Sequence, residues 1–294
     1  MNDQIKYWYR KYLPESFRNF ARKLIPTWLE LRFFSITTKN FNYEIQGHGE
    51  AKKILELCEE LQIKSGHYVD IGAADGWTSS STYPFAKDDS FSGLSIELDD
   101  KQYKKMEFIY KNFKNAHLLK KKVTPDNIVK LLNENSTPKE FDILNLDIDS
   151  YDLFVLKEIL KYFEPKIISM EINEKIPPPV IFTVLYDKQH FWQNDHFFGC
   201  SIQAAYEEVS KFKYKLFTLV YNNAIFIRDD LNIDFKEPSV LEAYNEGYKN
   251  KHDRVEKFSY NRDVDCVLDM DNKDIILFFN NFYKQYKGLY ELKL

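Results

Sequence analysis

The stretch HYVDIGAADG at residues 67–76 decides how this chain folds. In it, a short apolar run from Tyr68 to Ile71 meets Gly72 and Gly76, which stand four positions apart. A buried parallel strand typically ends in this way, because glycine accepts positive φ and lets the backbone approach a ligand closely. We therefore expect an α/β domain built around this strand and the turn that follows it.

On both sides of this stretch, strand and helix patterns alternate. Strands are expected at 67–71, 91–97, 116–121, 141–147 and 166–172, with a hairpin at 214–221 and 224–228. Helices are expected at 50–61, 77–86, 101–112, 125–132, 153–163 and 201–212. These elements predict an α/β fold with a mostly parallel seven-stranded sheet and a terminal antiparallel hairpin.

Three segments differ in composition. Residues 1–48 are a basic, aromatic, amphipathic arm that Pro14 and Pro26 divide into short helices. The arm is expected to pack on its own domain, to join a second subunit in a homo-oligomer, or to lie on an anionic membrane surface. Residues 49–230 contain the predicted domain, and residues 231–294 are expected to form a helical extension of unassigned role.

Composition narrows the function classes. The net charge of −4 does not indicate a nucleic-acid-binding surface. The sequence shows no secretory signal and no apolar run near eighteen residues. Cys58, Cys200 and Cys266 are far apart in the sequence and have no metal-type spacing, which suits thiols in a reducing compartment. We therefore expect a cytoplasmic protein, at the inner face of the membrane if the arm binds lipid.

Acidic residues stand where a nucleoside ligand would bind. In an open α/β sheet, ligands bind beyond the carboxyl ends of the strands, and an acid about twenty residues after the glycine turn can accept ribose hydroxyls. Glu97 has this position, while Asp70 and Asp75 flank a G-A-A-D-G turn that is not the dinucleotide pattern. Two carboxylates would repel a diphosphate but suit the ammonium and sulfonium groups of S-adenosylmethionine (SAM), which favours SAM over NAD. The predicted cofactor-binding residues are Asp70, Gly72, Ala73, Asp75, Gly76, Glu97, Leu98 and Asp147.

At this point the sequence resembles a known family. VDIGAADG (69–76) and SIELD (95–99) resemble motifs I and II of class I SAM-dependent methyltransferases, with Ala74 departing from the commoner G-x-G-x-G turn. Further matches resemble a bacterial branch related to FkbM-type enzymes: LDIDSYD (146–152), EINEKIPPP (171–179), YDKQHFW (186–192), DHFFGCS (195–201) and NNAIFIR (222–228). The resemblance covers about residues 50–230 and implies a Rossmann-like fold and SAM. It also implies methyl transfer to an oxygen of a sugar, glycan or nucleotide sugar, in polysaccharide or natural-product biosynthesis.

The densest acidic group follows the fourth and fifth strands. Asp147, Asp149 and Glu171 form a candidate site for a divalent cation such as Mg²⁺, which prefers oxygen ligands. A metal there would lower the pKa of an acceptor hydroxyl. The alternative is that Asp147 and Asp149 orient the methionine end of SAM, while Asp152 caps the following helix.

The irregular segment 173–199 is expected to cover the pocket. His196 is the favoured general base and His190 the second candidate, because histidine accepts protons near neutral pH. Asp147 is the third predicted catalytic residue. A structural role for either histidine is the alternative. The predicted substrate wall consists of Asn173, Tyr186, Trp192 and Phe197.

Other functions stay open. An N-methyltransferase of a small amine or a protein needs no strong base. A non-catalytic SAM-binding scaffold would keep the same cofactor residues. A nicotinamide dehydrogenase is disfavoured by the turn.

Overall fold

A computed structural model describes residues 48–78 and 80–294. Apart from His48, the basic arm expected over residues 1–48 lies outside these described residues. Within the described part of the chain, no helix is long and apolar enough to cross a membrane.

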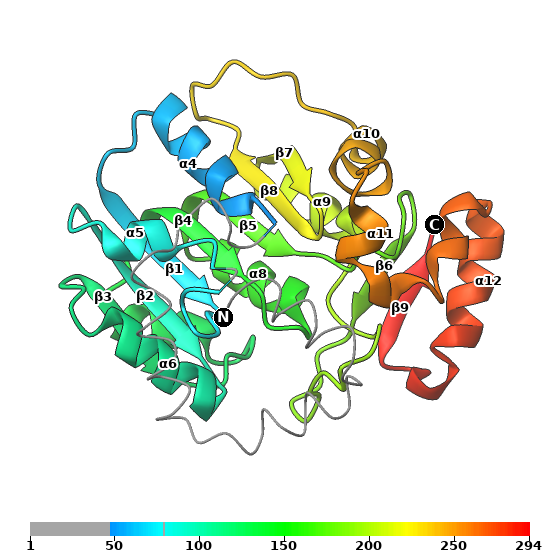
Figure 1. The fold of residues 1–294 in the computed structure, drawn as a ribbon, viewed down its shortest axis with the longest axis horizontal. Helices are drawn as coiled ribbons and strands as arrows, with labels where there is room; N and C mark the ends of the chain where they lie inside the picture. The colour runs from blue at the N-terminus through cyan, green and yellow to red at the C-terminus, as the bar shows by residue number, and fades with distance from the viewer. Residues whose placement is uncertain (1–47, 79) are drawn as a thin grey trace, which may run out of the picture.

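A seven-stranded sheet with the order β3-β2-β1-β4-β5-β8-β7 forms the centre of the molecule (Figure 1). Its strands are β1 (Gly66–Ile71), β2 (Phe91–Glu97), β3 (Ala116–Lys120), β4 (Glu140–Leu146), β5 (Glu164–Glu171), β7 (Tyr214–Val220) and β8 (Asn223–Arg228). Neighbours among β1 to β5 pair in parallel, and β8 is antiparallel to both β5 and β7. The predicted mostly parallel sheet with a terminal hairpin is confirmed.

The crossover helices largely follow the predicted ranges. They are α4 (Glu50–Glu60), α5 (Tyr83–Lys87), α6 (Asp100–Tyr110), α7 (Ile128–Glu134), α8 (Asp152–Leu160) and α9 (Ile202–Ser210). The prediction of a helix over 77–86 is wrong in its first half, since α5 begins at Tyr83. The cause is Asp75, whose Oδ1 accepts the backbone N–H groups of Trp77 and Thr78 and so folds the chain into a local turn.

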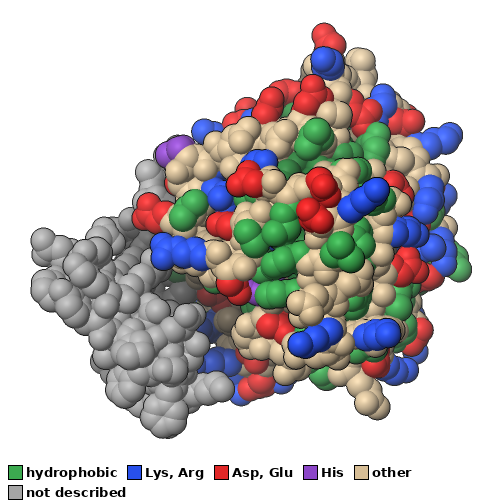
Figure 2. All heavy atoms as spheres, turned by 90° about the vertical axis from the view of Figure 1, so that its right-hand side faces the viewer, with side chains coloured by type: hydrophobic (Ala, Val, Ile, Leu, Met, Phe, Trp, Pro, Cys, Tyr) green, Lys and Arg blue, Asp and Glu red, His purple; other side chains and the backbone are tan. Residues whose placement is uncertain are grey.

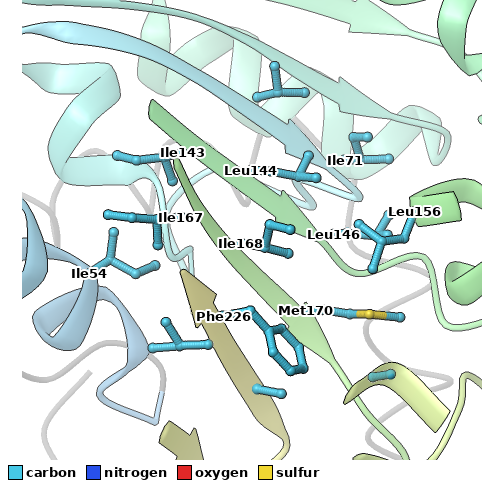
Figure 3. Close-up of a cluster of buried hydrophobic side chains, with 14 of the residues drawn as sticks. Ile54, Ile71, Ile143, Leu144, Leu146, Leu156, Ile167, Ile168, Met170 and Phe226 are labelled. Carbon is cyan, nitrogen blue, oxygen red and sulfur yellow. The ribbon is translucent and has the colours of Figure 1, made fainter. Parts of the chain in front are cut away.

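Buried strands at the centre of the sheet explain its continuous apolar runs. Figure 3 shows Ile143, Leu144 and Leu146 of β4 among side chains from β1, β5, β8 and two helices. All three side chains are fully buried. Because β4 is covered on both faces, it carries almost no alternation of apolar and polar residues. This packing fixes the carboxyl ends of the strands, where the acidic residues stand.

The tail from residue 231 onward holds several short elements and one further strand. These are α10 (Val240–Tyr244), the π-helix η3 (Asn245–Lys249), α11 (Arg254–Lys257), η4 (Ser259–Asn261), η5 (Asp265–Asp269), α12 (Asn272–Phe282), η6 (Lys284–Tyr286) and β9 (Tyr290–Lys293). β9 pairs antiparallel with β6 (Ile181–Val184) in a separate two-stranded sheet. The expectation that 173–199 is irregular throughout is therefore wrong at β6, because its partner strand lies far away in the sequence.

The tail also completes a second, smaller hydrophobic cluster. Phe182 of β6 and the loop residue Phe197 pack against Phe279 and Tyr283 of the tail, and all four side chains are buried. Figure 2 views the molecule from the side of α12 and shows hydrophobic side chains surrounded by charges of both signs. Through this cluster the tail packs against the segment that follows β5.

Candidate functional site

Two adjoining cavities lie at the carboxyl ends of the strands. The larger has a volume of about 640 Å³, and its walls come from segments 96–102, 121–123, 147–151 and 190–192. The smaller has a volume of about 200 Å³ and a polar lining that includes Asp70, Asn145 and Glu171. Gly72, Ala74 and Asp147 line both cavities, so the cavities meet at the turn after β1.

The two glycines of that turn have different tasks. Gly72 has φ +85°, and a Cβ built on it would lie 1.6 Å from the backbone oxygen of Asp147. Here the Asp147 N–H donates to the carbonyl of Ile71 at 2.9 Å, so two chain segments touch. Gly76 lines neither cavity, and a Cβ on it would collide with Met106 and Tyr110 of α6. The missing Cβ of Gly72 therefore leaves room for the backbone of Asp147 beside the cavities, and the missing Cβ of Gly76 lets α6 pack closely.

Asp70 and Asp75 lie apart in this turn. Asp70 is 1% exposed, lines the smaller cavity and accepts hydrogen bonds from Thr82 Oγ1 at 2.6 Å and Asn145 Nδ2 at 2.9 Å. Burial raises the pKa of Asp70 to about 6. Asp75 lines neither cavity, because its carboxylate holds the backbone of the turn.

Glu97 ends β2 at the wall of the larger cavity. Its Oε2 accepts the Ala74 N–H at 2.8 Å, and its Oε1 accepts the Asp99 N–H at 2.5 Å. The carboxylate thus ties the glycine turn to the loop after β2, and each oxygen keeps a further lone pair for a ligand. Burial raises the pKa of Glu97. Leu98 lines the larger cavity, and Ala73 lines the smaller one.

Asp147, Asp149 and Glu171 form an acidic triad in which one carboxylate oxygen of each residue lies within 4.8 Å of the others. Burial, reinforced by the neighbouring carboxylates, raises the pKa of Asp147 and Glu171 well above the usual range. The pKa of Asp149 is raised to about 6, mainly by burial and then by Asp152. Each raised pKa means that folding favours the protonated form, so stability is lost as the pH rises through these values. The ionised triad is destabilising, and a bound cation would relieve it.

Asp152 does not cap α8 as one reading suggested. Its Oδ1 accepts the Ile148 N–H at 2.8 Å, and its Oδ2 accepts the Ser150 N–H at 2.9 Å. The carboxylate therefore orders the loop before the helix. This loop holds Asp149 at φ 54°, a conformation that non-glycine residues seldom adopt.

The two candidate histidines are separated. His190 lines the larger cavity, and its Nε2 is buried with no partner among the described residues. Burial lowers the pKa of His190, which keeps the ring neutral at neutral pH. His196 lines neither cavity, and its Nε2 lies 3.2 Å from both carboxylate oxygens of Asp263. The structure therefore does not bring the favoured base, His196, to the acidic triad.

Of the four predicted substrate residues, Trp192 alone lines the larger cavity. Tyr186 donates its hydroxyl to Asp126 at 2.7 Å, outside the cavity. Asn173 is buried and donates to the carbonyls of His196 and Phe198. Phe197 is buried in the second cluster. The last three shape the segment that covers the cavity and do not line it.

Sequence reasoning missed several polar residues of the smaller cavity, among them His48 and Asn145. His48 lines it, and its ring centroid lies 5.3 Å from that of Tyr221 and 5.1 Å from that of Phe258. The sequence around His48 carries no signal, because its ring partners are far away in the chain. Asn145 was detectable, since it is the one amide in the buried β4 run ILNL (143–146) and needs a buried partner, which is Asp70.

Comparison with known proteins gives similarity at the level of structure. No family model matches the chain, and no curated protein matches it. Similar solved structures include the N-terminal domain of EvdMO1 in the presence of SAH and D-fucose, with 11% identity, 61% of this chain and 82% of that chain covered, and a TM-score of 0.41. A SAM-dependent methyltransferase from Clostridium acetobutylicum has 11% identity, coverage of 73% and 99%, and a TM-score of 0.39. An O-methyltransferase from Bacillus cereus in complex with SAH has 14% identity, coverage of 75% and 94%, and a TM-score of 0.40.

The fold assignment itself rests on topology. Five parallel strands in the order 3-2-1-4-5 are followed by β8, which lies antiparallel beside β5 and is covered at the edge by β7. This is the Rossmann-like fold of class I methyltransferases. The site lies at the carboxyl ends of its strands, where ligands bind in open α/β sheets.

Proposed function

We propose that this chain is a SAM-dependent methyltransferase that methylates a hydroxyl group of a sugar or glycan. The observation that carries the proposal is the pair of cavities that meet at Asp147, with Glu97 on the wall of the larger one. An elongated ligand with a nucleoside at one end and a cationic centre in the middle suits this arrangement. Carboxylates favour a nearby positive charge and would repel a phosphate.

The walls fit the parts of SAM. Glu97 is available to the ribose hydroxyls in the larger cavity. Ser80 and Ser81 line the smaller cavity and offer hydroxyl groups to an amino-acid end. Asp147, at the junction, would lie near the sulfonium. The missing Cβ of Gly72 lets the loop that carries Asp147 lie against the turn, which brings Asp147 to the junction of the cavities.

When bound, SAM supplies an electrophilic methyl group to an attacking oxygen atom. The chain contributes the position of both reactants, which accounts for much of the rate in such displacements. His190 is our candidate to receive the proton of the acceptor hydroxyl, because its ring is neutral and its Nε2 has no described partner. Phe191 and Trp192 line the same wall and would exclude water from the reacting groups.

We further propose that Asp147, Asp149 and Glu171 hold a divalent cation. Three converging carboxylates with raised pKa values offer the oxygen ligands that Mg²⁺ prefers. A metal there would lower the pKa of a coordinated hydroxyl.

Replacing Glu97 with glutamine should weaken binding of both SAM and S-adenosylhomocysteine (SAH), the product left after methyl transfer, about tenfold or more. The reason is that the ribose would lose a charged acceptor. Both ligands carry the same ribose, so their losses should match. Titration calorimetry measures the two affinities. Glu59→Gln, on the exposed side of α4, is the matched control and should bind like wild type. Wild-type affinity in Glu97→Gln would refute this placement of the nucleoside.

Cation binding should depend on pH. Without metal, the melting temperature should fall from pH 5 to pH 8 as Asp149 ionises, since its folded pKa is raised to about 6. Saturating Mg²⁺ should restore about 5 °C at pH 8 and little at pH 5, where protons compete for the same oxygens. Asp149→Asn should abolish the Mg²⁺ effect. An equal Mg²⁺ effect in Asp149→Asn would count against the metal site.

An N-methyltransferase acting on an amine is the second candidate, and the acidic triad supports it because a cationic acceptor would be attracted there. An amine can lose its proton to solvent before it reacts, so His190→Ala should keep most activity in that case and lose most of it for a hydroxyl acceptor. A scaffold protein would bind SAM without transferring methyl groups. Membrane contact or self-association through residues 1–48, and a cytoplasmic location, stay predictions.

A further inference from the structure

The larger cavity is covered by a loop that is held at three places. We call residues 186–195 the roof loop. His190, Phe191 and Trp192 of this loop line the cavity, and Phe191 and Trp192 are 52% and 37% exposed on their outer sides. The loop therefore separates the proposed nucleoside site from solvent.

Both ends of the roof loop are attached to the tail of the chain. Just before the loop, β6 pairs with β9, and the Leu185 N–H donates to the carbonyl of Leu289 at 2.8 Å. At the other end, Asp195 accepts a hydrogen bond from the Tyr286 hydroxyl. The ring of Phe197 stacks on Tyr286 with centroids 4.0 Å apart and planes 8° apart. Strand pairing and buried aromatic packing make this a firm attachment.

Residues 186–191 of the roof loop contact the opposite rim of the cavity. Asp126, in the loop after β3, accepts the Tyr186 hydroxyl at 2.7 Å and lies 3.6 Å from Lys188 Nζ. Lys122 Nζ donates to the carbonyl of Lys188 at 2.8 Å and lies 3.8 Å from the ring centroid of Phe191. These contacts are exposed and polar, and exposed ion pairs contribute little to stability.

We infer that the roof loop is a hinged cover, supported at its ends by the C-terminal tail and fastened over residues 186–191 by Asp126 and Lys122. The inference rests on the proposed function, because the cover acts on the nucleoside end of SAM. The firm attachment defines the hinge, and the weak one opens first. SAM would enter and SAH would leave past the Asp126 side. Asp126 and Tyr286 are thus positioning residues, and neither lines a cavity.

The test uses full-length protein and two pairs of variants. Asp126→Ala removes the contacts at the rim and is matched by Asp89→Ala, which breaks an exposed ion pair with Lys114 at 2.6 Å. Tyr286→Phe removes the bond to Asp195 but keeps the ring stack, and is matched by Tyr290→Phe, whose hydroxyl donates to Asn280. Hydrogen exchange of residues 187–194 and the dissociation rate of SAH are measured for each.

In Asp126→Ala, exchange in the roof loop and SAH dissociation should both rise about threefold to tenfold, while exchange in β1 stays unchanged. Tyr286→Phe should act in the same direction, and both control variants should behave like wild type. Loop exchange in Asp126→Ala equal to that in Asp89→Ala would overturn the inference, and so would faster exchange with unaltered SAH release. A wild-type protein that binds neither SAM nor SAH would instead defeat the proposed function, and the exchange comparison would still decide whether Asp126 fastens the loop.

Discussion

Replacing Gly72 with alanine should leave little folded protein. The new Cβ would lie 1.6 Å from the Asp147 backbone oxygen, far inside contact distance, where two strand-end loops meet. No side-chain rotation can relieve a clash with backbone, so the loops must separate. We expect a loss of more than about 3 kcal/mol in the free energy of unfolding. Urea unfolding followed by circular dichroism measures it.

Gly288 is the matched control for this substitution. It has φ +87°, nearly the φ of Gly72, but a Cβ on it would meet no atom within 4 Å. Gly288→Ala therefore carries the backbone penalty alone, about 1 kcal/mol. The difference in the free energy of unfolding between the two variants measures the effect of the contact with Asp147 alone. Equal losses would show that this close approach does not hold the site together.

Replacing Asp147 with asparagine should have opposite effects on stability and on SAM binding. The substitution removes a buried carboxyl group whose charged form folding disfavours, so the melting temperature at pH 8 should rise by about 3 °C. SAM affinity should fall about tenfold to a hundredfold, because its sulfonium loses an opposing charge. SAH has no sulfonium charge and should lose much less. Thermal melts and calorimetry with both ligands measure these effects.

Asp263→Asn serves as the control for Asp147→Asn. Asp263 is exposed, faces His196 and lines neither cavity, so its loss should change neither ligand's affinity. An equal loss of SAM and SAH affinity in Asp147→Asn would contradict the proposed charge pairing. A lower melting temperature at pH 8 would show that the carboxylate is stabilising where it stands.

The local sequence was enough to predict the parallel sheet and the end of its strands at which a ligand would bind. Four of the parallel strands carry an acid at or beside their carboxyl end, and the parallel order gathers these acids, Asp70, Glu97, Asp147 and Glu171, at one end of the sheet. Such contacts follow from topology once the strands are recognised.

The site residues that the sequence placed wrongly have surroundings set by distant parts of the chain. His196 looked suitable for catalysis, but its environment is set by Asp263, 67 residues further along the chain. Phe197 was predicted to contact the substrate. It packs instead in the second cluster, where the ring of Tyr286 from the tail stacks on it. In neither case does the local pattern reveal the partner. The same reason hid β6, whose neighbour is β9.

The pairing of β6 with β9 also affects the order in which parts of the chain can fold during translation. Ile181 has Lys293 as its partner, so the seven-stranded sheet can form while the cover of the larger cavity still lacks its support. At ordinary translation speeds this interval lasts on the order of ten seconds. During it the nascent chain would present Phe182 and Phe197 to the surroundings without Phe279 and Tyr283. Chaperone capture of ribosome-bound chains should therefore peak before residues 272–293 emerge and decline afterwards.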